Sequence, residues 1–136
     1  MGNTYPQYIT NAAIDSLNKK LNLKTVDSYS QDWEYEVSDS SRVSEFILFY
    51  EKNKLNDEEK FALMVLIISS LNDALEDGHT IGDLWNRVSY QLINDIKIHY
   101  NTIQYWAVED EDLEDCFAIT PSIRVIAKAI SENRMQ

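Results

Sequence analysis

The chain has 136 residues, the size of one domain, and its 44% of hydrophobic residues argues against a disordered chain. It carries 23 acidic and 12 basic side chains, a formal net charge of −11, which argues against binding to nucleic acid or an anionic membrane and favours a basic partner. Only three glycines and two prolines occur, which suits long helices better than an all-β fold with its many turns.

Two amphipathic helices are predicted in the first half of the chain. The first runs from about Tyr8 to Leu21, because apolar residues recur there at four-residue spacing. The second begins near Ser41, a suitable N-cap. The apolar positions that define the two helices are Ile9, Ala13, Leu17 and Leu21, and Val43, Phe46, Ile47 and Tyr50. Each helix is expected to bury this stripe against the rest of the protein.

The segment between these helices, residues 22–40, is long for a loop inside a compact domain. Trp33, Tyr35 and Val37 alternate there with polar residues, most of them acidic. Because the side chains of a β-strand point to opposite faces in turn, this alternation predicts a short extended segment. The sequence offers no evident second strand to pair with it.

A central helix is predicted over residues 56–77. Asn56 can cap its N-terminus while the Glu59 side chain reaches back to the Asn56 backbone, as in a capping box. The sequence FALMVLII that follows is apolar on every face, which predicts a helix surrounded by the others. Gly78 supplies the left-handed residue that ends this helix.

Two more helices are predicted in the last part of the chain. The first starts at the cap Thr80 and keeps a helical period as far as Trp106. Unbroken, it would have about 26 residues, so a kink or short break is expected near Asn101. The second starts at the cap Thr120, with Pro121 in its first turn.

These elements together predict an all-α fold. We expect a single domain over residues 1–136, a bundle of about five helices around the central helix 56–77, with a long acidic-aromatic loop at residues 22–40. Short links between most of the helices make this arrangement possible.

The cysteine count and the apolar runs predict the compartment. Cys116 is the only cysteine, so no intramolecular disulfide can form. The N-terminal sequence MGNTYPQYIT lacks the basic and apolar regions of a signal peptide. The longest apolar run, residues 61–68, is far shorter than the roughly 18 residues that span a bilayer. We therefore predict a cytoplasmic protein.

Two stretches are strongly acidic and supply the candidate site. DSYSQDWEYEVSD, residues 27–39, holds five acids, two tyrosines, one tryptophan and no base, and EDEDLED, residues 109–115, holds six acids in seven positions. Aromatic residues supply contact area and acids select a positive partner, so both stretches are predicted to bind one. The partner-binding candidates are Asp27, Tyr29, Asp32, Trp33, Glu34, Tyr35, Glu36, Asp39, Glu109, Asp110, Glu111 and Asp112.

Within this site, Trp33, Tyr29 and Tyr35 are predicted to be the buried anchors of the interface. In the alternative interpretation, Trp33 and Val37 pack over the bundle and the carboxylates simply face water. Acidity also keeps small proteins soluble, so the charge has an explanation that needs no partner.

Other kinds of site have little support in the sequence. EDEDLED lacks the glycine and the spaced ligands of an EF-hand loop, and His79 and His99 do not form a zinc motif. The negative charges of Glu114 and Asp115 oppose a thiolate at Cys116. Neither a glycine-rich phosphate loop nor a G-x-S-x-G sequence occurs. We predict no catalytic residue, no metal site and no cofactor.

A small, strongly acidic, all-helical chain with tyrosines in its acidic stretches resembles the helical immunity proteins that neutralise bacterial nuclease toxins, such as those of DNase colicins and contact-dependent growth inhibition systems. DSYSQDWEYEVSD and EDEDLED carry this resemblance. It implies stoichiometric binding of a basic toxin domain by a cytoplasmic protein that is a monomer or a weak homodimer. Two alternatives stay open: a helical adaptor or homodimeric protein, and a hydrolase that uses carboxylates and a divalent metal.

Overall fold

Every regular element in the described part of the chain is helical. The computed structural model describes residues 5–23 and 32–134, the last two by their backbone alone. These residues form seven α-helices and two short 3-10 helices, and they contain no strand. The α-helices are α1 (Asn11–Lys20), α2 (Trp33–Glu36), α3 (Val43–Lys52), α4 (Asp57–Glu76), α5 (Gly82–Asn94), α6 (Ile96–Ala107) and α7 (Thr120–Arg134), and the 3-10 helices are η1 (Ser40–Arg42) and η2 (Leu113–Asp115).

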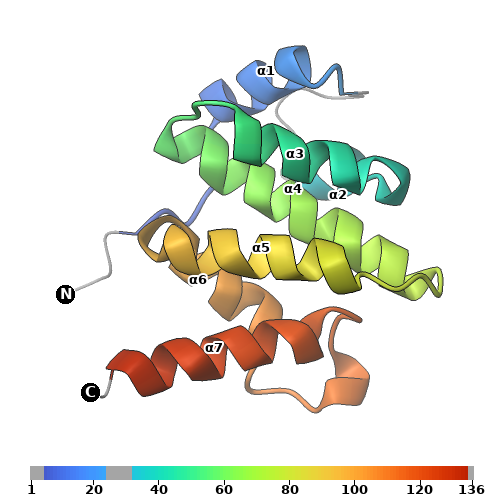
Figure 1. Cartoon of the computed structure of the whole chain (residues 1–136), viewed down its shortest axis with the longest axis vertical. Coiled ribbons are helices and arrows are strands. Elements are labelled where there is room, and N and C mark those ends of the chain that lie inside the picture. Colours follow the sequence, from blue (N-terminus) through green and yellow to red (C-terminus); the bar gives the residue numbers. More distant parts are fainter. Residues whose placement is uncertain (1–4, 24–31, 135–136) are drawn as a thin grey trace.

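Figure 1 shows these helices packed into a single compact domain. The predicted all-α class is confirmed, whereas the predicted number of five helices is wrong. The two additional helices arise from α2, where an extended segment was expected, and from a break that divides the long fourth helix into α5 and α6. None of the described helices combines the length and the apolar character needed to cross a bilayer.

The helix α2 stands where an extended segment was predicted, and it turns Tyr35, which a strand would place on the same face as Trp33 and Val37, towards the surface. Trp33 and Val37 lie four positions apart, the spacing of one helical turn, and only 1% and 6% of their surfaces are exposed. The Val37 amide donates a hydrogen bond to the Trp33 carbonyl oxygen at 3.0 Å. The Trp33 indole N–H donates to Asn18 Oδ1 in α1 at 3.0 Å, so α2 is fixed to α1.

The break in the long predicted helix lies at Asp95 and not near Asn101. Asp95 ends α5 and precedes α6, and its carboxylate accepts hydrogen bonds from Tyr50 in α3 at 2.7 Å and from Lys60 in α4 at 3.3 Å. Asn101 stays within α6 and its side-chain amide donates to the Tyr5 and Pro6 carbonyl oxygens. The position of the break therefore depends on partners from distant parts of the chain.

Two predicted helix caps are also wrong. Helix α5 begins after Ile81 and not after Thr80. Thr120 is the first residue of α7, and its hydroxyl donates to the Trp106 carbonyl oxygen at 2.7 Å. This hydrogen bond satisfies a carbonyl group at the C-terminal end of α6, so the Thr120 side chain does not cap α7.

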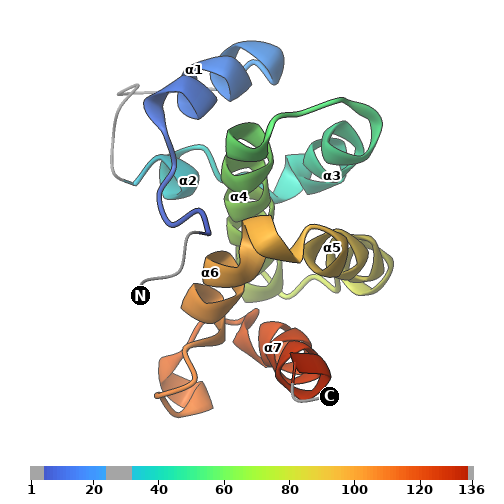
Figure 2. The same ribbon diagram turned by 90° about the vertical axis from the view of Figure 1, so that its left-hand side faces the viewer.

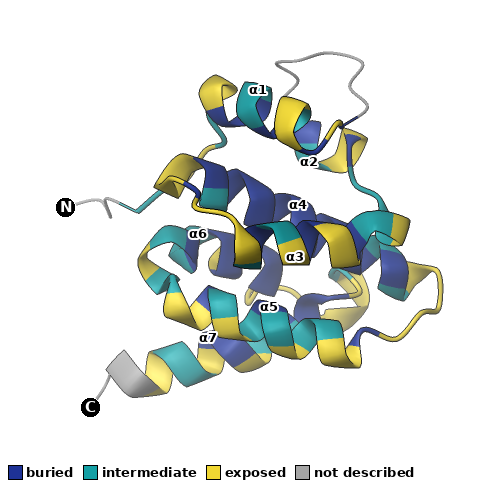
Figure 3. Ribbon diagram, turned by 45° about the horizontal axis from the view of Figure 1, so that its top comes forward, coloured by how far each residue is buried: buried dark blue, intermediate teal, exposed yellow. Residues whose placement is uncertain are grey.

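The helix α4 forms the centre of one half of the domain. The predicted capping box is confirmed, because the Glu59 amide donates to Asn56 Oδ1 at 2.8 Å and the Asn56 amide donates to Glu59 Oε1 at 3.1 Å. Gly78 follows with a positive φ of 86°, as expected for the residue that ends the helix. Residues 61–72 are all buried, as the dark blue of α4 in Figure 3 shows.

The surrounding helices do not all pack on α4. Helices α1, α2, α3 and α6 contact it, whereas α7 packs mainly on α6 and also contacts α5. Figure 2 shows α4 between α1, α2 and α3, with α6 and α7 following below. The prediction of one helix surrounded by all the others therefore holds only for the N-terminal half of the bundle.

A buried carboxylate holds α1 against α4. The Glu59 side chain is almost entirely buried, and its Oε2 atom accepts hydrogen bonds from the Ser16 hydroxyl at 2.5 Å and from Lys20 Nζ at 2.7 Å. Burial by itself would raise the pKa of Glu59, but the hydrogen bonds from Lys20, Ser16 and the Asn56 backbone outweigh it and lower this pKa to about 2. The ionised form of Glu59 therefore stabilises the folded state.

We predict that Glu59→Gln lowers the free energy of unfolding at neutral pH by about 1–3 kcal/mol, because the Lys20 ammonium group and the Ser16 hydroxyl lose their buried, charged acceptor. Glu58→Gln removes the same charge from the neighbouring exposed position and should change stability by less than about 0.5 kcal/mol. Urea unfolding measures both. Because the folded pKa lies below 4.5, the contribution of Glu59 is present above pH 4.5 and is lost as the pH falls towards 2. Equal effects of the two substitutions would contradict this role.

Candidate functional site

The fold brings the two acidic stretches to one side of the molecule. Figure 2 shows α2, α6 and the connection between α6 and α7 following one another down this side. The hydroxyl groups of Tyr35 in α2 and Tyr105 in α6 lie 2.9 Å apart and share a hydrogen bond. The Tyr105 ring stacks on Phe117, with ring centres 5.9 Å apart. We call α2, the end of α6 and residues 108–118 the acidic-aromatic face.

The acids of residues 109–115 are exposed and have no basic partner among the described residues. All six carboxylates face solvent. The ion pairs of the described chain lie elsewhere and join Lys20 to Glu59, Arg42 to Glu45, Lys60 to Asp95 and Arg87 to Glu51. Like charges so close together repel one another, and none of these ion pairs offsets the repulsion. Glu109, Asp110, Glu111 and Asp112 are therefore open to a partner, and their predicted role in binding one stays a prediction.

Arg124 holds this acidic loop by its backbone and leaves its carboxylates free. From α7, the Arg124 Nε atom donates to the Ala107 carbonyl oxygen at 2.7 Å, and Nη2 donates to the Val108 and Glu111 carbonyl oxygens at 2.6 and 2.7 Å. Val108 adopts a left-handed conformation with φ 42°, which is costly for a β-branched residue. The guanidinium contacts offset this cost and fix the path of the loop.

The candidates in the first acidic stretch differ in how far they are buried. Trp33 is 1% exposed and packs inside the bundle, as in the alternative interpretation, so its ring offers no surface to a partner as the predicted anchor of an interface would. Tyr35 is 43% exposed and stays on the surface, with Asp32 and Glu36 also exposed. Glu34 is half-buried. Tyr35 therefore replaces Trp33 as the aromatic centre of this part of the face.

Asp39 has a structural role, and Asp27 and Tyr29 are not among the described residues. Asp39 Oδ1 accepts hydrogen bonds from the Ser41 amide at 2.9 Å and the Ser41 hydroxyl at 2.5 Å, so Asp39 caps η1. Ser41, which was predicted to be an N-cap, instead has its own amide capped by Asp39.

Sequence reasoning missed Tyr105, Phe117 and Arg124. Tyr105 precedes the buried Trp106 on α6, and it is 56% exposed. An aromatic residue on the polar side of an amphipathic helix was the available signal for it. No comparable signal marks Arg124, because its carbonyl partners depend on the fold of the loop.

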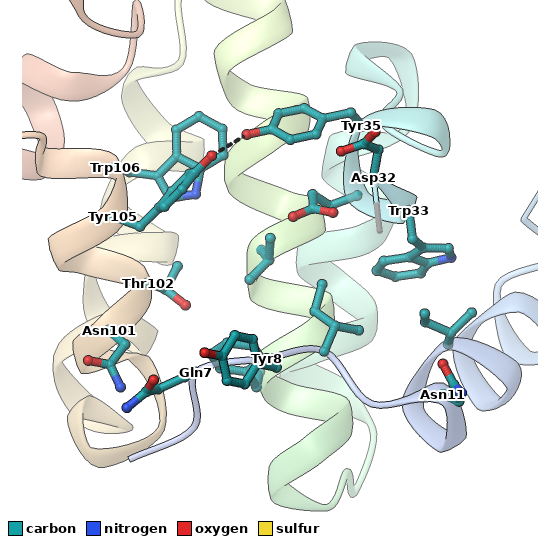
Figure 4. A pocket seen from close by; sticks show the side chains of 15 residues that line it. Gln7, Tyr8, Asn11, Asp32, Trp33, Tyr35, Asn101, Thr102, Tyr105 and Trp106 are labelled. Carbon is teal, nitrogen blue, oxygen red and sulfur yellow. Dashed lines mark hydrogen bonds between the residues drawn. The ribbon is translucent and has the colours of Figure 1, made fainter. Parts of the chain in front are cut away.

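A cavity of about 610 Å³ lies beside the acidic-aromatic face, and no pattern in the sequence predicts it. Its walls come from residues 7–9, α1, α2, α4 and α6 (Figure 4). Glu34 and Thr102 are among the residues that line it, and their Oε1 and Oγ1 atoms are buried without a hydrogen-bond partner. Such an atom costs about 1–3 kcal/mol, so two around one cavity need an explanation.

Two other clusters could be sites and are weaker. Carboxylate oxygens of Asp112, Glu114 and Asp115 lie within 4.8 Å of one another, but all three residues are exposed and no further ligand group comes from another part of the described chain. Cys116 lies beside them, where its Sγ atom accepts a weak contact from Arg124 Nη2 at 3.6 Å. These residues alone do not make a metal site or an activated nucleophile.

His99 belongs to a closed network in the interior. The Tyr50 hydroxyl lies 2.7 Å from both Asp95 Oδ2 and His99 Nε2. Because the Asp95 carboxylate can only accept, the single Tyr50 proton goes to Asp95 and His99 Nε2–H donates to the Tyr50 oxygen. The Nδ1 atom of His99 is then unprotonated, and it is buried without a partner. Burial lowers the pKa of His99 to about 4, so this histidine is neutral and structural.

Comparison of the chain with family models, with curated proteins and with solved structures gives no match. The function of the acidic-aromatic face is therefore inferred from its own geometry and charge.

We predict that His99 makes stability fall on acidification. Its folded pKa lies below the ordinary value of 6.5, so its contribution is complete above pH 6.5 and is lost as the pH falls towards 4. Between pH 7 and pH 4.5 the wild type should lose about 2–3 kcal/mol more than His99→Gln, which cannot titrate. His79→Gln, at the exposed histidine, should behave as the wild type. Urea unfolding across this pH range tests it, and equal slopes for wild type and His99→Gln would disprove it.

We also predict that Arg124→Ala loosens the acidic loop and leaves the rest of the bundle folded. Loss of hydrogen bonds from a charged donor to three carbonyl groups should speed amide exchange in residues 108–116 by about tenfold or more. Lys128→Ala, at an exposed position of the same helix, should leave this exchange unchanged. Hydrogen–deuterium exchange with mass spectrometry measures both variants. Unchanged exchange in Arg124→Ala would show that the loop is held by other contacts.

Proposed function

We propose that this chain is an acidic binding protein that neutralises a basic, nuclease-type toxin domain by stoichiometric binding, as its resemblance to helical immunity proteins implies. The observation that best supports this function is the set of six exposed carboxylates in residues 109–115, whose neighbouring cation, Arg124, is engaged by carbonyl groups. A rigid loop that concentrates negative charge without using it internally is suited to a positive partner.

In the proposed mechanism, charge and aromatic contact act on different steps of binding. The acidic loop attracts the Lys and Arg residues that a nuclease uses to hold nucleic acid, and it relieves its own repulsion when they bind. Tyr35 and Tyr105 lie exposed on the same face and offer rigid contact area. Charge then speeds association, whereas aromatic burial slows release.

The two alternative functions have weaker support. A carboxylate-dependent hydrolase would need acids that converge in a cleft, and the closest trio, Asp112, Glu114 and Asp115, is exposed. A homodimeric or adaptor protein is favoured by Tyr90 and Ile93, which lie three positions apart on α5 and are 64% and 49% exposed. Two such residues bury too little area for a stable dimer, so we propose a monomer or a weak homodimer in the cytoplasm.

We predict that removing charge from the acidic loop slows association with the partner. The test uses basic nuclease toxin domains, first the product of a reading frame adjacent to the gene of this chain. The loop variant combines Glu109→Gln, Asp110→Asn, Glu111→Gln and Asp112→Asn. The control removes four exposed charges elsewhere through Asp57→Asn, Glu58→Gln, Asp83→Asn and Glu132→Gln. At low salt the loop variant should associate about tenfold or more slowly than the wild type, and the control should change little.

Biolayer interferometry at low and physiological salt gives the rates, and nuclease assays at increasing protein ratios give the stoichiometry. Full inhibition at a one-to-one ratio is expected. An association rate that is independent of salt, or a loop variant that matches the control, would contradict electrostatic steering. A nuclease that stays active while the complex is saturated would contradict the inhibitor function.

A further inference from the structure

The cavity beside the acidic-aromatic face is open to solvent, and contacts between helices fix its walls. Its volume of about 610 Å³ lies inside the roughly 300–1,000 Å³ of sites that bury most of a drug-sized molecule. Figure 4 shows the hydrogen-bonded pair of Tyr35 and Tyr105 at one end and Tyr8 at the other. Tyr8 is 82% exposed, and α2 is held in place by the bond from Trp33 to Asn18. A group of this size can therefore enter from outside without rebuilding the walls.

The accessible wall of the cavity is mixed in character. Phe61 and Val65 of α4 are apolar, whereas Gln7, Asn11 and Asp32 are polar, and the two kinds contribute comparable parts of the wall. Such a wall suits a group that is apolar along its length and polar at its tip. The side chains of arginine and lysine are built in this way.

The charge of the wall selects a positive group. No lysine, arginine or histidine is among the described residues that line the cavity, whereas Asp32 and Glu34 are acidic. Asp32 is exposed, so a group from solvent can approach its carboxylate. A cation that enters is therefore attracted, and an anion is repelled.

The carboxyl group of Glu34 supports the same choice. Burial raises the pKa of Glu34, a hydrogen bond from its own backbone amide partly lowers it, and the charge of Asp32 raises it again. Glu34 takes part in none of the ion pairs of the described residues. A positive group in the cavity would stabilise ionised Glu34 through space, without contact with its buried Oε1 atom.

The exposed tyrosines distinguish arginine from lysine. Tyr8, Tyr35 and Tyr105 all line the cavity, and each is exposed. The guanidinium group of arginine is planar, stacks on aromatic faces and carries five N–H donors. The ammonium group of lysine is compact and more strongly hydrated. Several exposed rings beside the Asp32 carboxylate therefore favour arginine.

We propose that an arginine side chain of the basic protein partner enters this cavity, with its guanidinium group beside the Asp32 carboxylate and against a tyrosine ring at the rim. This assignment rests on the proposed function, because it gives one residue type of that partner one place on the protein. Tyr35 and Tyr105 belong both to the cavity and to the acidic-aromatic face, so one partner can contact both. The acidic loop then speeds association, and the bound arginine slows release.

The test titrates the isotope-labelled full chain with the peptide acetyl-Gly-Arg-Gly-amide and follows backbone amide signals by NMR. One side chain supports only millimolar affinity, which NMR measures and locates in the chain. Signals of α2 and of residues 101–106 should shift and saturate. The same peptide with citrulline, which has nearly the same shape and no charge, should bind about fivefold or more weakly. The peptide with lysine should bind several-fold more weakly than the arginine peptide.

Two substitutions with matched controls identify the contacts. Asp32→Asn should weaken binding of the arginine peptide about fivefold, because a charged acceptor is lost. Asp83→Asn removes the same charge from the exposed first turn of α5 and should change nothing. Tyr8→Ala should weaken binding about two- to threefold through loss of a ring. Tyr90→Ala, at an exposed tyrosine of α5 outside the cavity, should bind as the wild type does.

Several outcomes would overturn the proposal. Equal binding of the arginine and citrulline peptides would remove the role of charge, and shifts confined to residues 109–115 would place the arginine elsewhere. Tighter binding of the lysine peptide, or equal effects of Asp32→Asn and Asp83→Asn, would also contradict it. Tighter binding of methylguanidine than of the arginine peptide would assign the cavity to a small molecule. Cavity signals that shift with protein concentration alone would assign it to a second copy of this chain.

Failure of this proposal and failure of the proposed function give different results. The peptides contain no toxin domain, so the cavity can be tested whatever the association measurements show. With a toxin domain that forms the complex, each of its interface arginines is replaced by lysine, which keeps the charge. At one position the dissociation rate should rise about tenfold, while the association rate at low salt changes little. If no position does so, the arginine assignment is wrong and electrostatic steering still holds.

Discussion

The burial of Trp33 is the constraint on which both the surface and the cavity depend. Its ring is buried, α2 packs on α4, and the indole N–H is bonded to Asn18 of α1, so the orientation of α2 about its own axis is fixed by these contacts. Tyr35 lies two positions further, about 200° around a helix, and therefore points to the other side of α2. There it meets Tyr105 of α6, seventy positions away in the sequence. The tryptophan that the sequence suggested as an anchor for a partner is instead the anchor that orients the face.

The protein separates its charges into two groups with different uses. Charges that hold the bundle together are paired across helices, as with Glu59 and Lys20 or Glu51 and Arg87. Charges of the loop at residues 109–115 have no such pairs among the described residues, and the loop is fixed through its carbonyl groups by Arg124. The cost of this arrangement is mutual repulsion between neighbouring carboxylates. If the loop served only to connect α6 and α7, this repulsion would destabilise the fold without any compensating benefit.

Local sequence signals predicted the elements that local interactions determine. The capping box of Asn56 and Glu59, the buried course of α4 and the stop at Gly78 all follow from residues close together in the chain. The segment at residues 33–37 was misread because apolar side chains at positions 33 and 37 fit both a strand period and one helical turn. Its true state is decided by burial against α1 and α4. The break at Asp95 likewise depends on Tyr50 and Lys60, which sequence periodicity does not connect to it.

The candidate site was predictable in its charge and not in its shape. Exposure of the acidic loop followed from composition, but the aromatic row of Tyr35, Tyr105 and Phe117 and the cavity beside it require contacts between distant segments. Within that shape, the buried polar atoms without partners fall into two kinds. His99 Nδ1 is explained by its neutral tautomer, which needs no partner in a closed interior beyond the bond that Nε2–H gives to Tyr50. Glu34 Oε1 and Thr102 Oγ1 belong to residues that line the cavity, but surrounding protein atoms enclose both oxygens, so their unmet hydrogen-bonding capacity is a cost of packing α2 and α6 into the bundle.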